Sequence, residues 1–157
     1  MQADFCYELF DFCHKNGINT CLDTSGILLD ESVKKLLSIT DRVLLDIKYT
    51  SDADYLENVG CKLEKPLNFL KYLNEKSIPT TVRQVIIPTV NDTTEQIEEL
   101  KKIIKAHPCV DKVELLPFRK ICQTKYDSMC IPFPFANLDE ATKEDVDRLQ
   151  QTLTLAD

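Results

Sequence analysis

Glycine is scarce in this sequence, because its 157 residues include only Gly17, Gly26 and Gly60. A Gly-x-Gly-x-x-Gly turn, which lets a helix N-terminus approach the pyrophosphate of a dinucleotide, cannot be drawn anywhere in the chain. This absence argues against a Rossmann-type dinucleotide site.

Long apolar runs and an excess of positive charge are missing as well. No apolar stretch approaches the roughly 18 residues that a bilayer-spanning helix needs, and Met1–Asp4 carries neither a basic segment nor a signal-like apolar core. The net charge is −7, from 26 acidic and 19 basic residues, whereas nucleic-acid binders neutralise phosphates with basic side chains. The sequence therefore predicts a cytoplasmic protein whose partners include no nucleic acid and no membrane.

Cysteine is present, but never at short spacing. No two cysteines are separated by only two or three residues, so neither a zinc ribbon nor a local iron–sulfur loop can be drawn. In the reducing cytosol, such isolated thiols act as small buried hydrophobic side chains. The seven cysteines are Cys6, Cys13, Cys21, Cys61, Cys109, Cys122 and Cys130.

The chain does have a regular alternation of helical and strand-like segments. Apolar residues at helical spacing predict helices, and short runs rich in β-branched residues predict strands. The predicted helices span residues 4–15, 31–38, 52–59, 66–76, 93–106 and 140–153. The predicted strands span residues 18–24, 42–48, 80–87 and 112–118, and an irregular stretch covers 119–138.

This alternation predicts one α/β domain over residues 1–157. A strand, a crossover helix and a further strand imply parallel pairing, and about four parallel strands make half of an eight-stranded (β/α) barrel. We expect a partial (β/α) barrel, with a small open doubly wound sheet as the alternative. A half-barrel leaves its first strand with an unpaired edge and its inner apolar face half covered, so we expect self-association through the open barrel edge.

Polar side chains gather where the first two predicted strands end, and α/β folds bind ligands at such carboxyl ends. Asp23 and Thr24 end the first strand, and Asp46 and Lys48 end the second. Because strand side chains alternate, Leu44, Asp46 and Lys48 point to the same side. If the two strands are neighbours, Asp23 and Asp46 come close together, and two carboxylates at one strand end can hold a cation.

Two other interpretations of these residues stay open. The first is a structural salt bridge that joins Asp23 or Asp46 to Lys48 or to Arg83 of the third strand. The second is a Schiff-base role for Lys48, as in barrel aldolases, which requires a desolvated amine. Flanking carboxylates would favour the protonated form of that amine.

Five short motifs recur along the chain and carry a family resemblance. They are Cys21-Leu22-Asp23-Thr24-Ser25-Gly26, Leu45-Asp46-Ile47-Lys48, Val82-Arg83-Gln84-Val85-Ile86-Ile87-Pro88 with Asn91-Asp92, Glu114-Leu115-Leu116-Pro117-Phe118, and Lys125-Tyr126. In this order and at similar distances, they occur in pyruvate formate-lyase activating enzymes and their glycyl-radical activase relatives. Over nearly its whole length the chain resembles the C-terminal half of these radical S-adenosylmethionine enzymes.

The resemblance implies a partial (β/α) barrel, S-adenosylmethionine and a [4Fe-4S] cluster. In the full-length family these generate a 5′-deoxyadenosyl radical, which takes a hydrogen atom from a backbone glycine of a partner glycyl radical enzyme. The implied S-adenosylmethionine contacts are Asp46, Ile47 and Lys48, with Arg119 where the family usually has a contacting histidine. The implied monovalent-cation site consists of Asp23, Thr24, the Leu44 carbonyl and Asp46.

The sequence also departs from the family pattern. The Cys-x-x-x-Cys-x-x-Cys cluster motif and the Gly-Gly-Glu segment of the family have no counterpart here. We therefore expect no cluster on this chain alone and assign no catalytic residue. Three hypotheses follow: a fragment of a radical S-adenosylmethionine activating enzyme, a non-catalytic half-barrel that binds a glycyl radical enzyme, and an unrelated barrel aldolase that uses Lys48.

Overall fold

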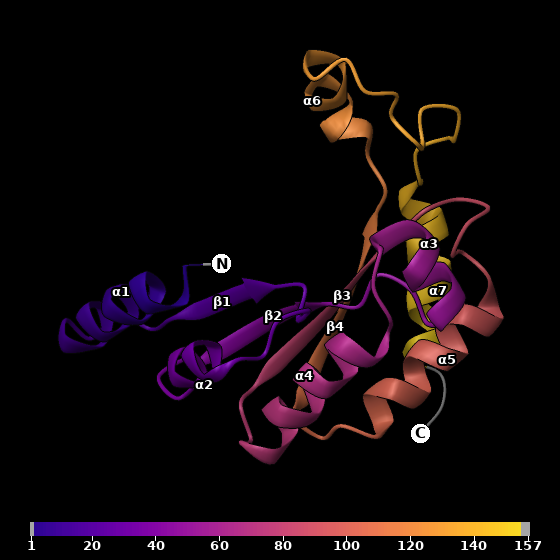
Figure 1. Ribbon diagram of the computed structural model, residues 1–157. Helices are drawn as coiled ribbons and strands as arrows, with labels where there is room; N and C mark the ends of the chain where they lie inside the picture. The colour runs from indigo at the N-terminus through magenta and orange to yellow at the C-terminus, as the bar shows by residue number, and fades with distance from the viewer. Residues whose placement is uncertain (1, 155–157) are drawn as a thin grey trace.

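Four parallel strands form the centre of the computed structural model, which describes residues 2–154 (Figure 1). Their order in the sheet, β1-β2-β3-β4, follows the chain and lacks the reversal that defines a doubly wound sheet. The prediction of about four parallel strands alternating with helices is confirmed. The strands are β1 (Cys21–Thr24), β2 (Arg42–Asp46), β3 (Thr80–Ile86) and β4 (Val110–Pro117).

Helices connect these strands and follow the last one. They are α1 (Ala3–Lys15), α2 (Glu31–Leu37), α3 (Asp52–Val59), α4 (Glu64–Glu75), α5 (Thr94–Lys105), the 3₁₀ helix η1 (Lys120–Cys122), α6 (Gln123–Ser128) and α7 (Lys143–Thr154). The prediction of an irregular stretch over 119–138 is wrong where η1 and α6 lie. Both helices are too short to show an apolar stripe. The predicted strand at 18–24 begins only at Cys21, the first residue in register with β2.

Local sequence signals account for several turns and helix ends. Thr93 and Gln96 form the capping box that starts α5, with each side chain bonded to the backbone of the other. Gly17 follows α1 with a φ of +71°, a conformation that disfavours other residues. Gly26 has a φ of +66°, and a Cβ atom there would lie 2.7 Å from Leu45 Cδ1. The turn after β1 therefore requires glycine.

Helices cover one face of the sheet, and this face forms the core. Val43, Leu45, Val82 and Ile86 are fully buried, in one cluster with the apolar sides of α2, α4, α5 and α7. The side chains that alternate with them point to the opposite face, which we call the open face. It carries mainly polar and charged side chains, namely Asp23, Arg42, Asp46, Thr81, Arg83, Lys112 and Glu114. The expectation of an apolar inner face is therefore wrong, because the apolar strand residues lie mostly on the covered side.

Exposed apolar side chains lie instead on α1, which packs against α2 beside β1 (Figure 1). Phe5, Leu9 and Phe12 are 67%, 46% and 63% exposed. Their spacing places them along one stripe of the helix. Among residues 2–154, strand β1 pairs only with β2, so its outer edge has no strand partner within this range. No helix within residues 2–154 is long and apolar enough to cross a membrane.

Candidate functional site

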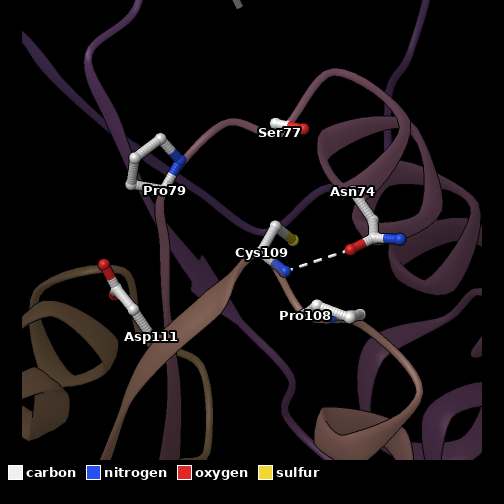
Figure 2. A pocket seen from close by; sticks show the side chains of 6 residues that line it. All are labelled: Asn74, Ser77, Pro79, Pro108, Cys109 and Asp111. Carbon is white, nitrogen blue, oxygen red and sulfur yellow. Dashed lines mark hydrogen bonds between the residues drawn. The ribbon is translucent and has the colours of Figure 1, made fainter.

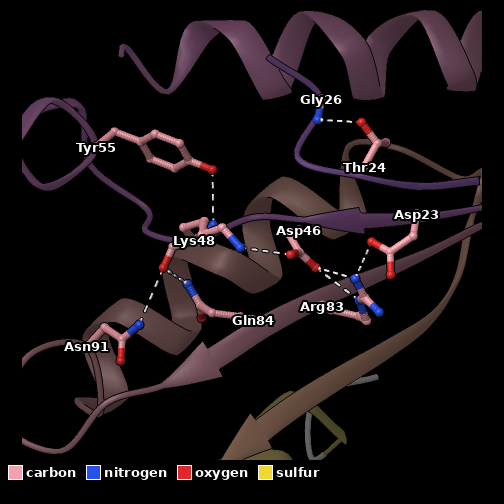
Figure 3. A network of polar contacts seen from close by, with 9 residues as sticks. All are labelled: Asp23, Thr24, Gly26, Asp46, Lys48, Tyr55, Arg83, Gln84 and Asn91. Atoms are coloured by element: carbon pink, nitrogen blue, oxygen red, sulfur yellow. Dashed lines mark hydrogen bonds and ion pairs between the residues drawn. The ribbon is translucent and has the colours of Figure 1, made fainter. Parts of the chain in front are cut away.

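Four charged side chains form one network at the carboxyl ends of β1 and β2 and beside the middle of β3 (Figure 3). Arg83 Nη2 donates to Asp23 Oδ1 at 2.6 Å and also lies 2.8 Å from Asp46 Oδ1. Arg83 Nε donates to the same Asp46 oxygen at 2.9 Å, and Lys48 Nζ donates to the other Asp46 oxygen at 2.7 Å. Two carboxylates and two cations are thus linked in the order Asp23, Arg83, Asp46, Lys48.

Arg83 is the centre of this network and its least exposed member. Its side chain is 17% exposed, against 24% for Asp46 and 61% for Asp23. Burial by itself lowers the pKa of Arg83, but the hydrogen bond to Asp23 and the charge of Asp46 outweigh burial, so the pKa is raised. The guanidinium stays charged, and its bonds to described residues use Nε and Nη2. The Nη1 donors remain available to a ligand.

The network confirms two expectations from the sequence, namely the proximity of the two carboxylates and a salt bridge with a neighbouring cationic side chain. Asp23 and Asp46 come close together, as expected for neighbouring strands, and both also form salt bridges. The aldolase interpretation finds no support, because Lys48 is 40% exposed and paired with Asp46. A Schiff-base lysine needs a desolvated amine.

Of the expected cation ligands, Asp23 and Asp46 lie in the network, whereas the Thr24 side chain alternates with Asp23 and points to the other face of the sheet (Figure 3). Leu44 is in register with Asp23 across β1 and β2, and Thr24 Oγ1 accepts a hydrogen bond from the Gly26 amide at 3.1 Å. The guanidinium of Arg83 lies between the two carboxylates, at the place expected for the cation. A cation would fit there only after Arg83 had exchanged its carboxylate partners.

The other two predicted S-adenosylmethionine contacts, Ile47 and Arg119, lie in different parts of the structure. Ile47 follows β2 with a fully buried side chain, and its amide donates to the Arg83 carbonyl at 3.0 Å. Arg119 does not join the network: its Nη1 atom donates to the Ala141 carbonyl and lies 3.7 Å from Glu140 Oε2. Of the four predicted S-adenosylmethionine contacts, the structure thus brings together Asp46, Ile47 and Lys48.

Sequence reasoning missed three residues that touch the backbone of Lys48. Tyr55, Gln84 and Asn91 are almost fully buried, and each forms a hydrogen bond with the backbone amide or the backbone carbonyl of Lys48. Gln84 gave a signal, because it is a polar residue at a strand position that alternation assigns to the apolar face. Arg83 was noted only as a structural partner, although it lies at the centre of the network.

Two cavities lie at opposite ends of the sheet. One, of about 290 Å³, adjoins the end of β1 and is lined by Thr24, Ser25, Ile27 and Leu28. The other, of about 430 Å³, lies where β3 and β4 begin (Figure 2). Its lining includes Cys109, whose pKa is raised by burial, so its thiol is a weak nucleophile. Neither lining includes a member of the charged network.

The cysteines do not form a cluster site. All seven are free thiols, and no three His, Cys, Asp or Glu side chains of residues 2–154 gather closely enough to hold a metal ion. Five of the cysteines are only partly exposed, while Cys21 and Cys130 are exposed. The side chains described here therefore do not fit a [4Fe-4S] cluster, which needs four ligands, usually thiolates.

Comparison with known proteins decides the family. The radical SAM superfamily model matches residues 1–104, which include β1, β2, β3 and the whole charged network. The chain belongs to the radical SAM superfamily. The expected membership is confirmed, and the network lies in the part of this radical SAM chain that the family model matches.

Curated relatives carry the resemblance further. The chain is 32% identical over 155 residues to the pyruvate formate-lyase 1-activating enzyme of Escherichia coli K12, covering 98% of this chain and 63% of that enzyme. It is 32% identical over 153 residues to the pyruvate formate-lyase-activating enzyme of Clostridium pasteurianum, covering 98% of this chain and 64% of the relative. The radical SAM chain thus spans slightly less than two thirds of the length of these relatives.

Solved structures share the fold. A domain of the pyruvate-formate lyase-activating enzyme from Bacteroides vulgatus superimposes with a TM-score of 0.77 at 18% identity, over 97% of this chain and 85% of that one. SuiB of Streptococcus suis superimposes with a TM-score of 0.71 at 17% identity, over 94% of this chain and 32% of that one. The four-stranded α/β arrangement is therefore one that radical SAM structures also contain.

Proposed function

We propose that this chain forms the S-adenosylmethionine-recognising part of an enzyme that activates a glycyl radical enzyme of the pyruvate formate-lyase type. The observation that carries the proposal is the linked series Asp23, Arg83, Asp46 and Lys48, which lies at the carboxyl ends of β1 and β2 and beside the middle of β3. The names of the curated relatives support the choice of partner enzyme.

The network suits the amino-acid end of S-adenosylmethionine. A guanidinium binds a carboxylate through paired hydrogen bonds, so Arg83 would take the ligand carboxylate. Asp46 would accept from the ligand ammonium, and Lys48 would add a second cation near the carboxylate. Ile47 would contribute its backbone carbonyl, since its amide is already bonded and its side chain is buried.

Arg83 links this binding to the proposed cation. When its guanidinium turns to a ligand carboxylate, Asp23 and Asp46 lose a shared positive partner. Two carboxylates this close repel each other, and a monovalent cation held with Thr24 and the Leu44 carbonyl would relieve the repulsion. Arg119 would contribute to the adenosine end only after leaving its present bond to Ala141.

Bound S-adenosylmethionine supplies a sulfonium whose carbon–sulfur bond yields the radical on one-electron reduction. The described residues offer no ligand set for the cluster that delivers this electron. The function proposed for these residues is therefore recognition of S-adenosylmethionine, and the radical chemistry belongs to the whole enzyme.

Calorimetric titration with S-adenosylmethionine tests this function directly, after anaerobic iron–sulfur reconstitution has been attempted. We expect saturable binding and no stable cluster absorbance. Lys48→Met should weaken binding, whereas Lys112→Met should not, because Lys112 lies on the same face but pairs with Glu114. An absence of binding to the wild-type chain, or equal losses in the two variants, would refute the proposal.

A second proposal concerns self-association through the open barrel edge. Strand β1 has an edge that pairs with no other described strand, and α1, which packs against α2, exposes the stripe of Phe5, Leu9 and Phe12. An unpaired edge and an apolar patch both favour association. Light scattering should show a dimer that dissociates in the double variant Phe5→Ser and Phe12→Ser. A monomer over a wide range of wild-type concentrations would refute this proposal.

A further inference from the structure

The backbone amide and carbonyl of one residue, Lys48, are held by three side chains from three different segments (Figure 3). The Lys48 amide donates to Tyr55 Oη at 3.0 Å. Gln84 Nε2 and Asn91 Nδ2 each donate to the Lys48 carbonyl at 3.3 Å. Tyr55 lies on α3, Gln84 on β3, and Asn91 in the loop before α5. We call these three side chains the Lys48 clamp.

The Lys48 clamp is buried and well fixed. Tyr55 is 1% exposed, and Gln84 and Asn91 are each 2% exposed. Burial raises the pKa of Tyr55 to about 12, so its hydroxyl stays neutral over the physiological range. The Asn91 side chain also bonds to two backbone groups at the end of β3, at 2.7 and 2.9 Å. The clamp thus ties Lys48 to the body of the sheet.

The Lys48 clamp lies just beyond the end of β2, where strand pairing no longer supplies hydrogen bonds to the chain. Strand β2 ends at Asp46, and the bond from the Ile47 amide to the Arg83 carbonyl lies just beyond it. The next backbone groups, the amide and the carbonyl of Lys48, are bonded to side chains instead of a strand. Buried backbone groups need such partners, but one donor would satisfy the carbonyl, and two converge on it.

The hydrogen bond from Gln84 to Lys48 is accompanied by a loss of folding stability at Gln84 itself. Its Nε2 atom donates to Lys48, but its Oε1 atom is buried without a hydrogen-bond partner among residues 2–154. An unpaired buried acceptor lowers stability, and an apolar residue at this position would avoid the loss. The contribution of Gln84 is therefore its bond to Lys48, and not a gain in folding stability.

We propose that the Lys48 clamp sets the position of the Lys48 ammonium against Asp46, and so shapes the charged network for its ligand. Tyr55, Gln84 and Asn91 are then positioning residues. A change in the backbone dihedral angles of Lys48 would redirect its side chain and lengthen the 2.7 Å contact with Asp46. The part that concerns S-adenosylmethionine rests on the proposed function, whereas the part that concerns the ammonium does not.

The first experiment measures the ammonium without any ligand. Acetic anhydride acetylates free amines, and mass spectrometry compares the rate at Lys48 with the rates at Lys34 and Lys102, which form ion pairs on helices α2 and α5. The variants are Tyr55→Phe and Gln84→Met. Each loses one bond to Lys48, and we expect Lys48 to react about two- to tenfold faster, the scale of one hydrogen bond.

Tyr49→Phe is the matched control. Tyr49 is 4% exposed and packs edge-to-face on Tyr55 with ring centroids 6.2 Å apart, so it loses a hydroxyl in the same cluster. Among residues 2–154 the Lys48 amide donates to Tyr55 Oη and not to Tyr49, so the control should leave the Lys48 rate unchanged. An unchanged rate in both Tyr55→Phe and Gln84→Met, or an equal rise in the control, would overturn the proposal.

The second experiment is calorimetric titration of the same variants with S-adenosylmethionine. We expect the dissociation constant to rise by a similar factor in Tyr55→Phe and Gln84→Met, and to stay constant in Tyr49→Phe. A faster Lys48 reaction with unchanged affinity would overturn the ligand part of the inference. If the wild-type chain does not bind S-adenosylmethionine, the proposed function fails, and the acetylation rates alone decide the clamp. If Tyr55→Phe does not fold, Gln84→Met decides both measurements.

Discussion

Two arginines lie on the open face of the sheet, and they use their guanidinium groups differently. Arg42, where β2 begins, meets both oxygens of Asp111 at 2.7 and 2.6 Å and bonds to Thr81 Oγ1 at 3.1 Å. Arg83, in the middle of β3, is shared between Asp23 and one oxygen of Asp46. The first arginine has a single bidentate partner, and the second has two partial ones.

The two arginine side chains also differ in their exposed fractions. The Arg42 and Asp111 side chains are 39% and 47% exposed, whereas the Arg83 side chain is 17% exposed. An exposed bidentate pair is complete in itself and contributes little energy. A partly buried guanidinium with unused donors can exchange one carboxylate for another at modest cost. The amino end of the open face therefore has a structural tie, and the carboxyl end has a site suited to a ligand.

Replacement of each arginine by glutamine gives the largest expected contrast. Arg83→Gln should raise the dissociation constant for S-adenosylmethionine about a hundredfold, because it removes two charge-assisted hydrogen bonds to the ligand. Arg42→Gln should change it by less than about twofold, because Arg42 binds no ligand group under this proposal. Calorimetric titration measures both constants.

Thermal unfolding of the two variants is the control for this contrast. Both should unfold cooperatively, because neither arginine belongs to the apolar core. If Arg42→Gln weakens binding as much as Arg83→Gln does, the two ends of the open face are equivalent and the comparison fails.

A smaller effect should follow from the cation. Replacement of sodium and potassium salts by tetramethylammonium chloride, at constant ionic strength, should weaken S-adenosylmethionine binding about fivefold, the scale of one partly solvated ion pair. The large cation cannot enter between Asp23 and Asp46 after Arg83 has turned to the ligand. Calorimetry in the two salts measures this difference.

The matched variant for this effect is Asp23→Asn. It removes one of the two repelling carboxylates, so the difference between the salts should disappear. An equal salt effect in wild type and Asp23→Asn would show that no cation is held between these carboxylates.

The sequence was sufficient to predict the fold, the members of the network and a salt bridge among them, but not which pairs form. Alternation along the strands placed Asp46 and Lys48 on one side, and the order of helices and strands made β1 and β2 neighbours. Both expectations depend on local periodicity, which a sequence contains. The bond between Arg83 and Asp23 spans two strands and depends on the register of three, which periodicity does not specify.

The Lys48 clamp was beyond sequence reasoning for a related reason. Tyr55 is far from Gln84 and Asn91 in the chain, and all three bond to the backbone amide or carbonyl of Lys48. Backbone partners of this kind follow from where a strand stops, and strand ends are the least certain part of a prediction from sequence. The predicted strand 42–48 included Lys48, whereas β2 ends at Asp46. Those two residues decide whether Lys48 belongs to the sheet or to the clamp.

The smallest expected effect is the dependence of stability on pH at the amino end of the open face. The hydrogen bond from Arg42 lowers the pKa of Asp111 from its ordinary value of 3.8. A carboxyl group with a lowered pKa stabilises the fold above that ordinary value, and the stabilisation is lost as the pH falls through the lowered one. Both side chains are more than one third exposed, so solvent screening limits the contribution to at most about 1 kcal/mol.

Thermal unfolding of wild type and Asp111→Asn should therefore give a small gap in melting temperature at pH 7. That gap should close as the pH falls below 3.8, because the wild-type chain then also lacks the charged pair. A gap that persists in acid would mean that Asp111 stabilises the fold through its packing and not through its charge.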